Sequence, residues 1–123
     1  MALHLDHTIV PAKDKEESAR FLARMLGLEY NGPWGHFAPV KVDDNLSFDF
    51  DTREEFESHH YALIASDEEF DAILNRVKEE GITYGSGPFS SEDGEINHLH
   101  TGRGFYFKDA NSHLWEVITH TYI

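Results

Sequence analysis

The sequence contains no cysteine. Disulfide bonds, thiolate nucleophiles and zinc sites built from cysteine are therefore excluded, and the lack of disulfides fits the cytoplasmic location that we expect. Basic residues are also few: 10 Lys and Arg stand against 23 Asp and Glu, so the formal net charge is −13. A negative field of this size repels phosphate groups. We therefore expect neither nucleic acid nor a membrane surface as a partner.

Long hydrophobic runs are absent as well. The N-terminal stretch MALHLDHTIVPAK is apolar but is interrupted by His4, Asp6 and His7, so it resembles neither a signal peptide nor a membrane-spanning helix. The chain has 123 residues, of which 40% are hydrophobic and 13% aromatic, and it contains 9 histidines. This composition is typical of a single globular domain over residues 1–123 with a real core.

Two segments have the periodicity of amphipathic helices, at about residues 14 to 26 and 67 to 80. Each apolar stripe is preceded by a residue that suits an N-cap and is followed by a glycine that suits the helix end. These flanking residues are Asp14 and Gly27 for the first helix, and Ser66 and Gly81 for the second.

Runs rich in β-branched and aromatic residues predict strands around both helices. They are LHLDHTIV, LEY, HFAPVKV and LSFDFD in the first half, and HHYALIA, ITY, GFYFKD and LWEVITH in the second. His60 follows His7 by 53 residues, and Gly81 follows Gly27 by 54. We interpret the pattern as one β-α-β-β-β unit used twice, over about residues 1–54 and 55–123.

Three stretches that cover more than half of the chain carry a family resemblance: LDHTIVPAKDKEESARFLARMLGL, HHYALIASDEEFDAILNRVKEEGITY and GRGFYFKDANSHLWEV. They resemble the vicinal oxygen chelate superfamily, which includes glyoxalase I, fosfomycin-resistance transferases, extradiol dioxygenases and bleomycin-resistance proteins. The last stretch is similar to the family pattern FYFxDPDGHxxE, except that DANSH replaces the Asp-Pro-Asp-Gly turn. The geometry of that turn is therefore open.

The resemblance implies an α+β fold in which two βαβββ repeats form a curled mixed sheet, or cup, with the helices on its outer face. It also implies a divalent metal ion held by His7, His60 and Glu116. Fe, Mn, Ni and Zn all suit two imidazoles and one carboxylate, and such a triad leaves coordination positions open for a small-molecule substrate. Short members of this superfamily generally pair, so we expect a homodimer.

Two assignments around this triad stay open. His59 competes with His60, because adjacent strand residues face opposite sides and only one of them can point into the cup. We choose His60, which has the repeat offset. Asp49 in LSFDFD has the same apolar-acid-apolar setting as Glu116 in LWEVI. It is either a fourth ligand, as the likeness to glyoxalase I implies, or a group that acts through water or is only solvated.

Tyr106 and His98 are the catalytic candidates. Tyr106 lies ten residues before Glu116, a spacing similar to that of the active-site tyrosine in extradiol dioxygenases, although an aromatic residue here serves packing equally well. His98 belongs to the loop GEINHLHTGRG, and loops of this kind often carry function. An exposed strand residue is an equally good interpretation of His98. The same loop brings in Asn97, His100 and Arg103 as possible pocket residues.

Three classes of function are compatible with these patterns. We expect a metal-dependent enzyme that chelates a small oxygenated molecule and stabilises an anion, either a glyoxalase-like lyase or isomerase or a dioxygenase. The alternative is a non-catalytic protein of the bleomycin-resistance type that sequesters a small molecule. The three metal-ligand candidates count against it, because that branch typically lacks them. The third class is an interaction module with no metal.

Overall fold

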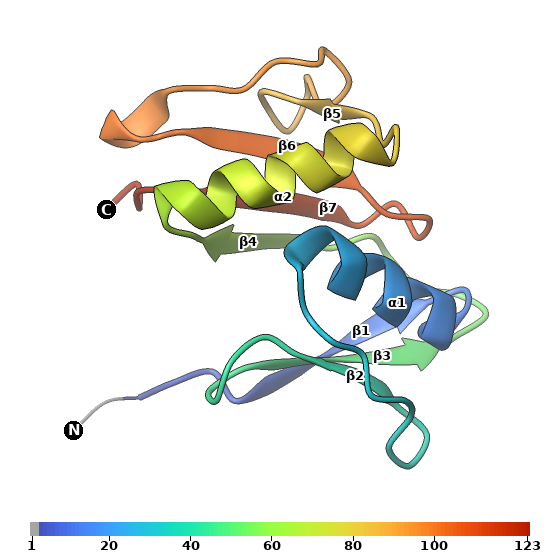
Figure 1. The fold of residues 1–123 in the computed structure, drawn as a ribbon. Coiled ribbons are helices and arrows are strands. Elements are labelled where there is room, and N and C mark those ends of the chain that lie inside the picture. The colour runs from blue at the N-terminus through green and yellow to red at the C-terminus, as the bar shows by residue number, and fades with distance from the viewer. Residues whose placement is uncertain (1–2) are drawn as a thin grey trace. The chain divides into compact units, whose positions relative to one another are not determined.

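The computed structural model describes residues 3–123 of the chain. The chain folds as two compact units, Met1–Glu57 and Ser58–Ile123, close to the repeat boundaries expected from the sequence. Each unit combines one helix with one mixed β-sheet (Figure 1). The fold class is therefore α+β, as predicted, with two open sheets.

The first unit contains three strands and one helix. In chain order these are β1 (His7–Ala12), α1 (Lys15–Leu26), β2 (Ala38–Lys41) and β3 (Ser47–Thr52). The strand order is β1-β3-β2, in which β1 is parallel to β3 and β2 is antiparallel to it. Alternation along the strands buries Val10, Phe48 and Phe50 on the face that packs with α1.

The second unit contains four strands, one helix and a short 3₁₀ turn. In chain order these are β4 (His60–Ile64), α2 (Asp67–Glu79), β5 (Tyr84–Gly85), the turn Leu99–Thr101, β6 (Gly104–Lys108) and β7 (Leu114–Ile118). The strand order is β4-β7-β6-β5, and β4 is parallel to β7. The α2 residue Phe70 packs edge-on against Phe105 of β6, with ring centroids 5.2 Å apart, so α2 covers the face that carries Phe105.

Both predicted helices are confirmed, together with their end signals. The Asp14 carboxylate accepts hydrogen bonds from the first-turn N–H groups of Glu16 and Glu17. Gly27 ends α1 in the left-handed conformation, at φ 72°. At the start of α2, Ser66 and Glu69 form a reciprocal capping box.

One predicted strand, at residues 28–30, is absent. The Tyr30 hydroxyl donates to the Glu16 carboxylate at 3.2 Å, and the Arg20 guanidinium lies 5.5 Å from the centroid of the Tyr30 ring. Both partners belong to α1, so this segment packs back on the helix and does not join the sheet. The first unit is consequently β-α-β-β, whereas the second has the full β-α-β-β-β order.

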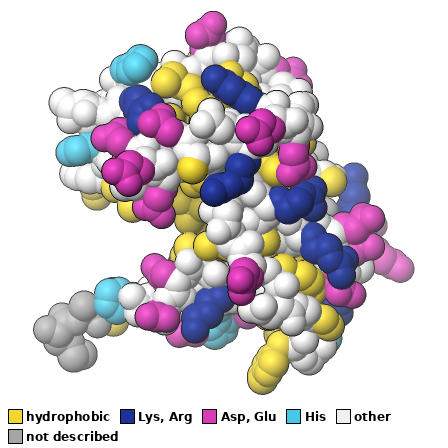
Figure 2. All heavy atoms as spheres, viewed as in Figure 1, with side chains coloured by type: hydrophobic (Ala, Val, Ile, Leu, Met, Phe, Trp, Pro, Cys, Tyr) yellow, Lys and Arg dark blue, Asp and Glu magenta, His cyan; other side chains and the backbone are white. Residues whose placement is uncertain are grey.

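The acidic side chains visible on the surface agree with the excess of Asp and Glu in the sequence. Acidic side chains lie on both units in the view of Figure 2, as a net charge of −13 leads one to expect. Over residues 3–123, no helix combines the length and the apolar character that are needed to cross a membrane.

Candidate functional site

His60 and Glu116 meet on the face of the second sheet that is opposite to α2. In the parallel register Glu116 pairs with Ala62, so His60 is its diagonal neighbour on the same face. The Nε2 atom of His60 lies 2.9 Å from Oε1 of Glu116. The Glu116 side chain is only 16% exposed, whereas that of His60 is 49% exposed. A largely covered strand carboxylate is thus paired with an imidazole that solvent reaches.

Tyr106 completes this cluster from the other neighbouring strand. It lies directly opposite Glu116 in the antiparallel register, and the Glu116 carboxylate acts on its hydroxyl. Its ring centroid is 5.9 Å from that of His60. Burial and the negatively charged partner raise the pKa of Tyr106 to about 12. The phenol therefore keeps its proton at neutral pH and serves as a hydrogen-bond donor.

His59 lies on the other side of the strand. Its ring is 5.6 Å from that of His113 and 6.1 Å from that of Tyr61. Its backbone N–H donates to Nδ1 of His113 at 2.9 Å, and the His113 side chain is fully buried. The geometry therefore agrees with the choice of His60 as the neighbour of Glu116.

The first unit contains a pair in the same relative position. In the parallel β1–β3 register, Asp49 pairs with Ile9, so His7 is diagonal to Asp49 as His60 is to Glu116. The Asp49 carboxylate accepts a hydrogen bond from the Ser47 hydroxyl at 2.6 Å. The internal repeat thus extends to the placement of a histidine and a carboxylate on paired parallel strands.

His7 has a carboxylate partner of its own. Its Nδ1 atom lies 2.7 Å from Oδ2 of Asp6. This hydrogen bond raises the pKa of His7, and the negative charge of Asp49 acts in the same direction. Both side chains of the contact are exposed, 60% for His7 and 88% for Asp6.

The His60–Glu116 pair fits a divalent metal ion, judged by its donor atoms and their spacing. Two metal–ligand bonds of about 2.1 Å at a right angle put their donors about 3.0 Å apart, close to the observed separation. One imidazole nitrogen and one carboxylate oxygen suit Fe, Mn, Ni and Zn. Within either unit, residues 3–123 contain no group of three or more candidate ligands. His60 and Glu116 are two of the three predicted ligands, and the ligand role of these two residues and of His7 stays a prediction.

The loop between β5 and β6 holds the other catalytic candidate. His98 is exposed, and its side chain makes no hydrogen bond or ring contact with His60, Tyr106 or Glu116 in the described structure. Its catalytic role stays a prediction. The neighbouring Asn97 has a structural role, because its amide donates to the Ser86 carbonyl at 2.9 Å and fastens the loop.

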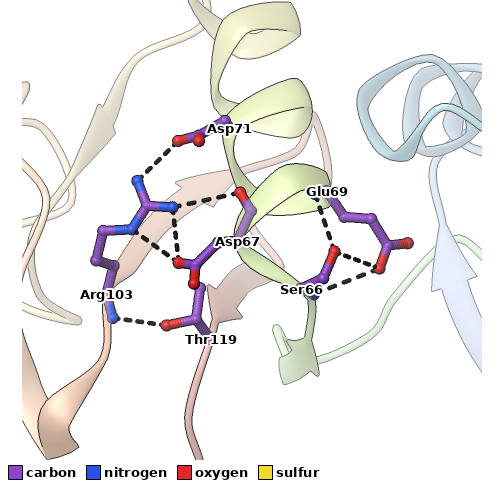
Figure 3. Close-up of polar contacts among 6 residues, drawn as sticks. All are labelled: Ser66, Asp67, Glu69, Asp71, Arg103 and Thr119. Carbon is purple, nitrogen blue, oxygen red and sulfur yellow. Dashed lines mark hydrogen bonds and ion pairs between the residues drawn. The ribbon is translucent and has the colours of Figure 1, made fainter.

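Arg103 fastens the end of the same loop to α2. Its guanidinium donates to the carboxylates of Asp67 and Asp71, at 2.9 and 2.7 Å (Figure 3). The guanidinium carbon also lies 4.4 Å from the centroid of the Phe70 ring. Its backbone N–H donates to the Thr119 hydroxyl at 2.8 Å. The side chain thus serves as a clamp on the helix side of the sheet, opposite to the face of Glu116.

The DANSH turn before β7 is organised by Asp109. One carboxylate oxygen accepts the N–H groups of Asn111 and His113, at 2.9 and 3.0 Å, and the other accepts Nε1–H of Trp115 at 3.0 Å. Ser112 is in the left-handed region at φ 65°, at the position where the family pattern has glycine. Sequence reasoning missed the role of His113, which ties this turn to the residue before His60.

A cavity of about 350 Å³ lies in the first unit. Asp6, Glu29, Lys41 and Asp44 are among the residues that line it, and neither His7 nor Asp49 does so. Asp6 therefore borders both the cavity and the imidazole of His7.

Comparison with known proteins identifies the family of this chain. The model of the Glyoxalase/Bleomycin resistance protein/Dioxygenase superfamily matches residues 4–117. The solved structure of oxidase ChaP-H2 is 45% identical, with a TM-score of 0.92 over 99% of this chain and 97% of that one. Oxidase ChaP-H1 is 42% identical, with a TM-score of 0.92 over 98% of each chain. The glutathione transferase FosA of Serratia marcescens is 26% identical over 95% of this chain and 81% of that protein. The chain belongs to the Glyoxalase/Bleomycin resistance protein/Dioxygenase superfamily.

Proposed function

We propose that the protein is a metal-dependent enzyme that oxidises a small oxygenated molecule, with dioxygen as the oxidant. The observation that carries the proposal is the contact of 2.9 Å between the imidazole of His60 and the carboxylate of Glu116 on an accessible sheet face. The likeness to two structures named as oxidases, at 45% and 42% identity, favours oxidation over group transfer, because the likeness to the transferase is only 26%.

The ligands that we propose are His7, His60 and Glu116. Two imidazoles and one carboxylate form the facial triad of non-haem iron oxygenases, although Mn, Ni and Zn also suit this donor set. A bound divalent metal would polarise the substrate oxygens that it contacts. The equivalent register of His7 in the first sheet supports its inclusion. We also propose a homodimer, since closed symmetric pairs are the commonest assemblies.

Tyr106 acts in two ways in this proposal. Its pKa of about 12 keeps the hydroxyl protonated and able to donate, and a hydrogen bond from it would orient the opposed Glu116 carboxylate. Beside it, the same sheet face carries Ala62 and Ile64, and Ile64 is 65% exposed. We infer that this apolar surface contacts the carbon skeleton of the substrate while the polar cluster receives its oxygens.

The first experiment is metal analysis of protein purified without a histidine tag, followed by metal titration. We expect about one divalent ion per chain in the parent, and an affinity that is about 10-fold or more lower in Glu116→Gln, which keeps the shape and removes the charge. Glu54→Gln, in the exposed segment before β4, is the control for the loss of one charge.

Oxygen uptake with small vicinal diols, catechols and hydroxyquinones then tests the reaction. Turnover that requires both the metal and dioxygen supports the proposal. Metal-dependent turnover without oxygen uptake would point to the lyase or isomerase alternative. A parent protein that binds small molecules but no divalent metal would instead be a sequestration protein, and the proposal would be wrong.

A further inference from the structure

The contact between Asp6 and His7 leaves one particular ring nitrogen available. Oδ2 of Asp6 lies 2.7 Å from Nδ1 of His7, and a carboxylate can only accept a hydrogen bond. The proton of a neutral His7 ring therefore lies on Nδ1. Nε2 then carries the lone pair, which is the form that an imidazole needs in order to bind a metal ion.

The backbone around this contact is anchored. The carbonyl of Asp6 accepts a hydrogen bond from the N–H of Ser47 at 2.9 Å, which begins the pairing of β1 with β3. The nearby Asp49 carboxylate is held by the Ser47 hydroxyl. The two carboxylates thus have different roles, since Asp6 is bound to His7 and Asp49 is bound to its own strand.

The second unit differs, because the carboxylate there faces the other ring nitrogen, and in a neutral His60 the proton lies on Nε2 until a bound metal replaces it. His60 directs Nε2, not Nδ1, toward Glu116. Histidines that bind metals almost always donate their other ring N–H to a carboxylate, a carbonyl or water, and this partner fixes the tautomer and strengthens the ligand. In the first unit, the Asp6 carboxylate is the group that accepts the hydrogen bond from Nδ1–H of His7.

We propose that Asp6 is a positioning residue for the metal site: its carboxylate holds His7 in the Nδ1–H tautomer with Nε2 directed at the ion. This inference rests on the proposed function, because it requires that His7 is a ligand. It adds a residue outside the predicted triad whose loss weakens metal binding without removing a ligand.

The test uses metal-free protein first. Two-bond ¹H–¹⁵N correlation spectra of the histidine rings, assigned through His7→Gln, report the tautomer of His7. We expect the Nδ1–H form in the parent and a mixture of tautomers in Asp6→Ala, which has no side-chain acceptor. Asp6→Asn retains an oxygen that can accept and should restore much of the Nδ1–H population. A merely structural role for Asp6 would leave these populations unchanged.

Metal affinity is then measured with Zn(II) alone, by competition with a chelator. Asp6→Ala should weaken binding about 10- to 100-fold, and Asp6→Asn should fall between it and the parent. The matched control is Asp44→Ala, since Asp44 lines the same cavity, carries the same charge and is fully exposed. Its affinity should stay within about 3-fold of the parent, because exposed charges at a distance are screened by salt.

The outcomes separate the two proposals. If His7→Ala loses Zn(II) while Asp6→Ala binds it as tightly as the parent, the role of Asp6 is refuted and the metal site stands. If Asp44→Ala weakens binding as much as Asp6→Ala, the effect is one of net charge and the role of Asp6 is refuted. A parent that binds no Zn(II), Mn(II) or Fe(II) overturns both proposals.

Discussion

Tyr106 and Glu116 are directly opposed on β6 and β7, and the carboxylate helps to raise the pKa of the phenol. Cross-strand neighbours of this kind have their Cβ atoms within about 5.5 Å of each other, so the contact follows from the register alone. Ionisation of the phenol would put two negative charges side by side in a largely buried place. The pair therefore consists of a protonated phenol next to a carboxylate.

A spectrophotometric titration of the tyrosines tests this relationship. We expect one tyrosine of the parent to ionise near pH 12, and that phase to be missing in Tyr106→Phe. Because the folded pKa lies above the ordinary value of about 10, the stabilisation from this group is complete below pH 10 and is lost as the pH rises through about 12. A rapid pH jump with absorbance detection records the ionisation before the protein unfolds.

Two variants serve as controls for that titration. Tyr61→Phe removes a different tyrosine, whose pKa is raised by burial and by Asp109, and should leave the phase near pH 12 in place. Glu116→Gln should lower the pKa of Tyr106 only in part, because burial is the larger cause of the shift. An unchanged pKa in Glu116→Gln would show that the carboxylate does not act on the phenol.

The two adjacent histidines at the start of β4 should differ in metal binding. His60→Ala removes the imidazole beside Glu116 and should lower the metal affinity about 10-fold or more. His59→Ala keeps the backbone N–H that bonds to His113, so the strand should stay in register and metal binding should change little. Isothermal titration with Mn(II) measures both. Loss of binding in His59→Ala alone would reverse the assignment.

Much of the fold could be predicted because its signals are local. The caps at Asp14 and Ser66 depend on partners within the first helical turn, and both are confirmed. Residues 28–30 were predicted wrongly as a strand, because Tyr30 bonds to a residue 14 positions earlier and nothing within the segment reveals that contact. Short strand-like runs are decided by their tertiary partners.

Prediction of the candidate site was limited in the same way, by contacts between residues that are far apart in the sequence. The repeat offset selected His60, and the register sets this residue diagonal to Glu116, while its role as a ligand stays a prediction. The part played by His113 was missed, because its partner His59 lies 54 residues away in the sequence. Arg103 was considered as a pocket residue, whereas its acidic partners lie on α2, which packs on the other face of the sheet.

The clamp formed by Arg103 should contribute measurably to stability. Its carboxylate partners are exposed, at 77% for Asp67 and 59% for Asp71, so each ion pair is weak, and the contact with the Phe70 ring adds to them. We expect Arg103→Ala to lower the free energy of unfolding by about 1 to 2 kcal/mol, and Arg103→Lys, which lacks the planar fork, by about half of that. Urea unfolding measures both changes.

A double-mutant cycle shows how much of that effect comes from the ion pairs. Asp71→Asn alone should cost under about 1 kcal/mol, and its cost should shrink in the Arg103→Ala background and in high salt. Additive effects of the two changes would show that the ion pair with Asp71 contributes nothing measurable, and that Arg103 stabilises the protein through Asp67 and Phe70.

Ser112 carries strain that glycine would relieve. It is an exposed serine at φ 65°, a conformation that costs a residue with a Cβ atom roughly 1 to 2 kcal/mol and costs glycine little. Part of the gain is offset by the greater freedom of glycine in the unfolded chain, so Ser112→Gly should raise the free energy of unfolding by about 0.5 to 1 kcal/mol. Ser112→Ala is the matched control, because it removes the hydroxyl and keeps the Cβ atom. Urea unfolding should place the alanine variant at or below the parent and the glycine variant above it, whereas equal stability of the two variants would show that the turn around Asp109 accommodates this backbone without strain.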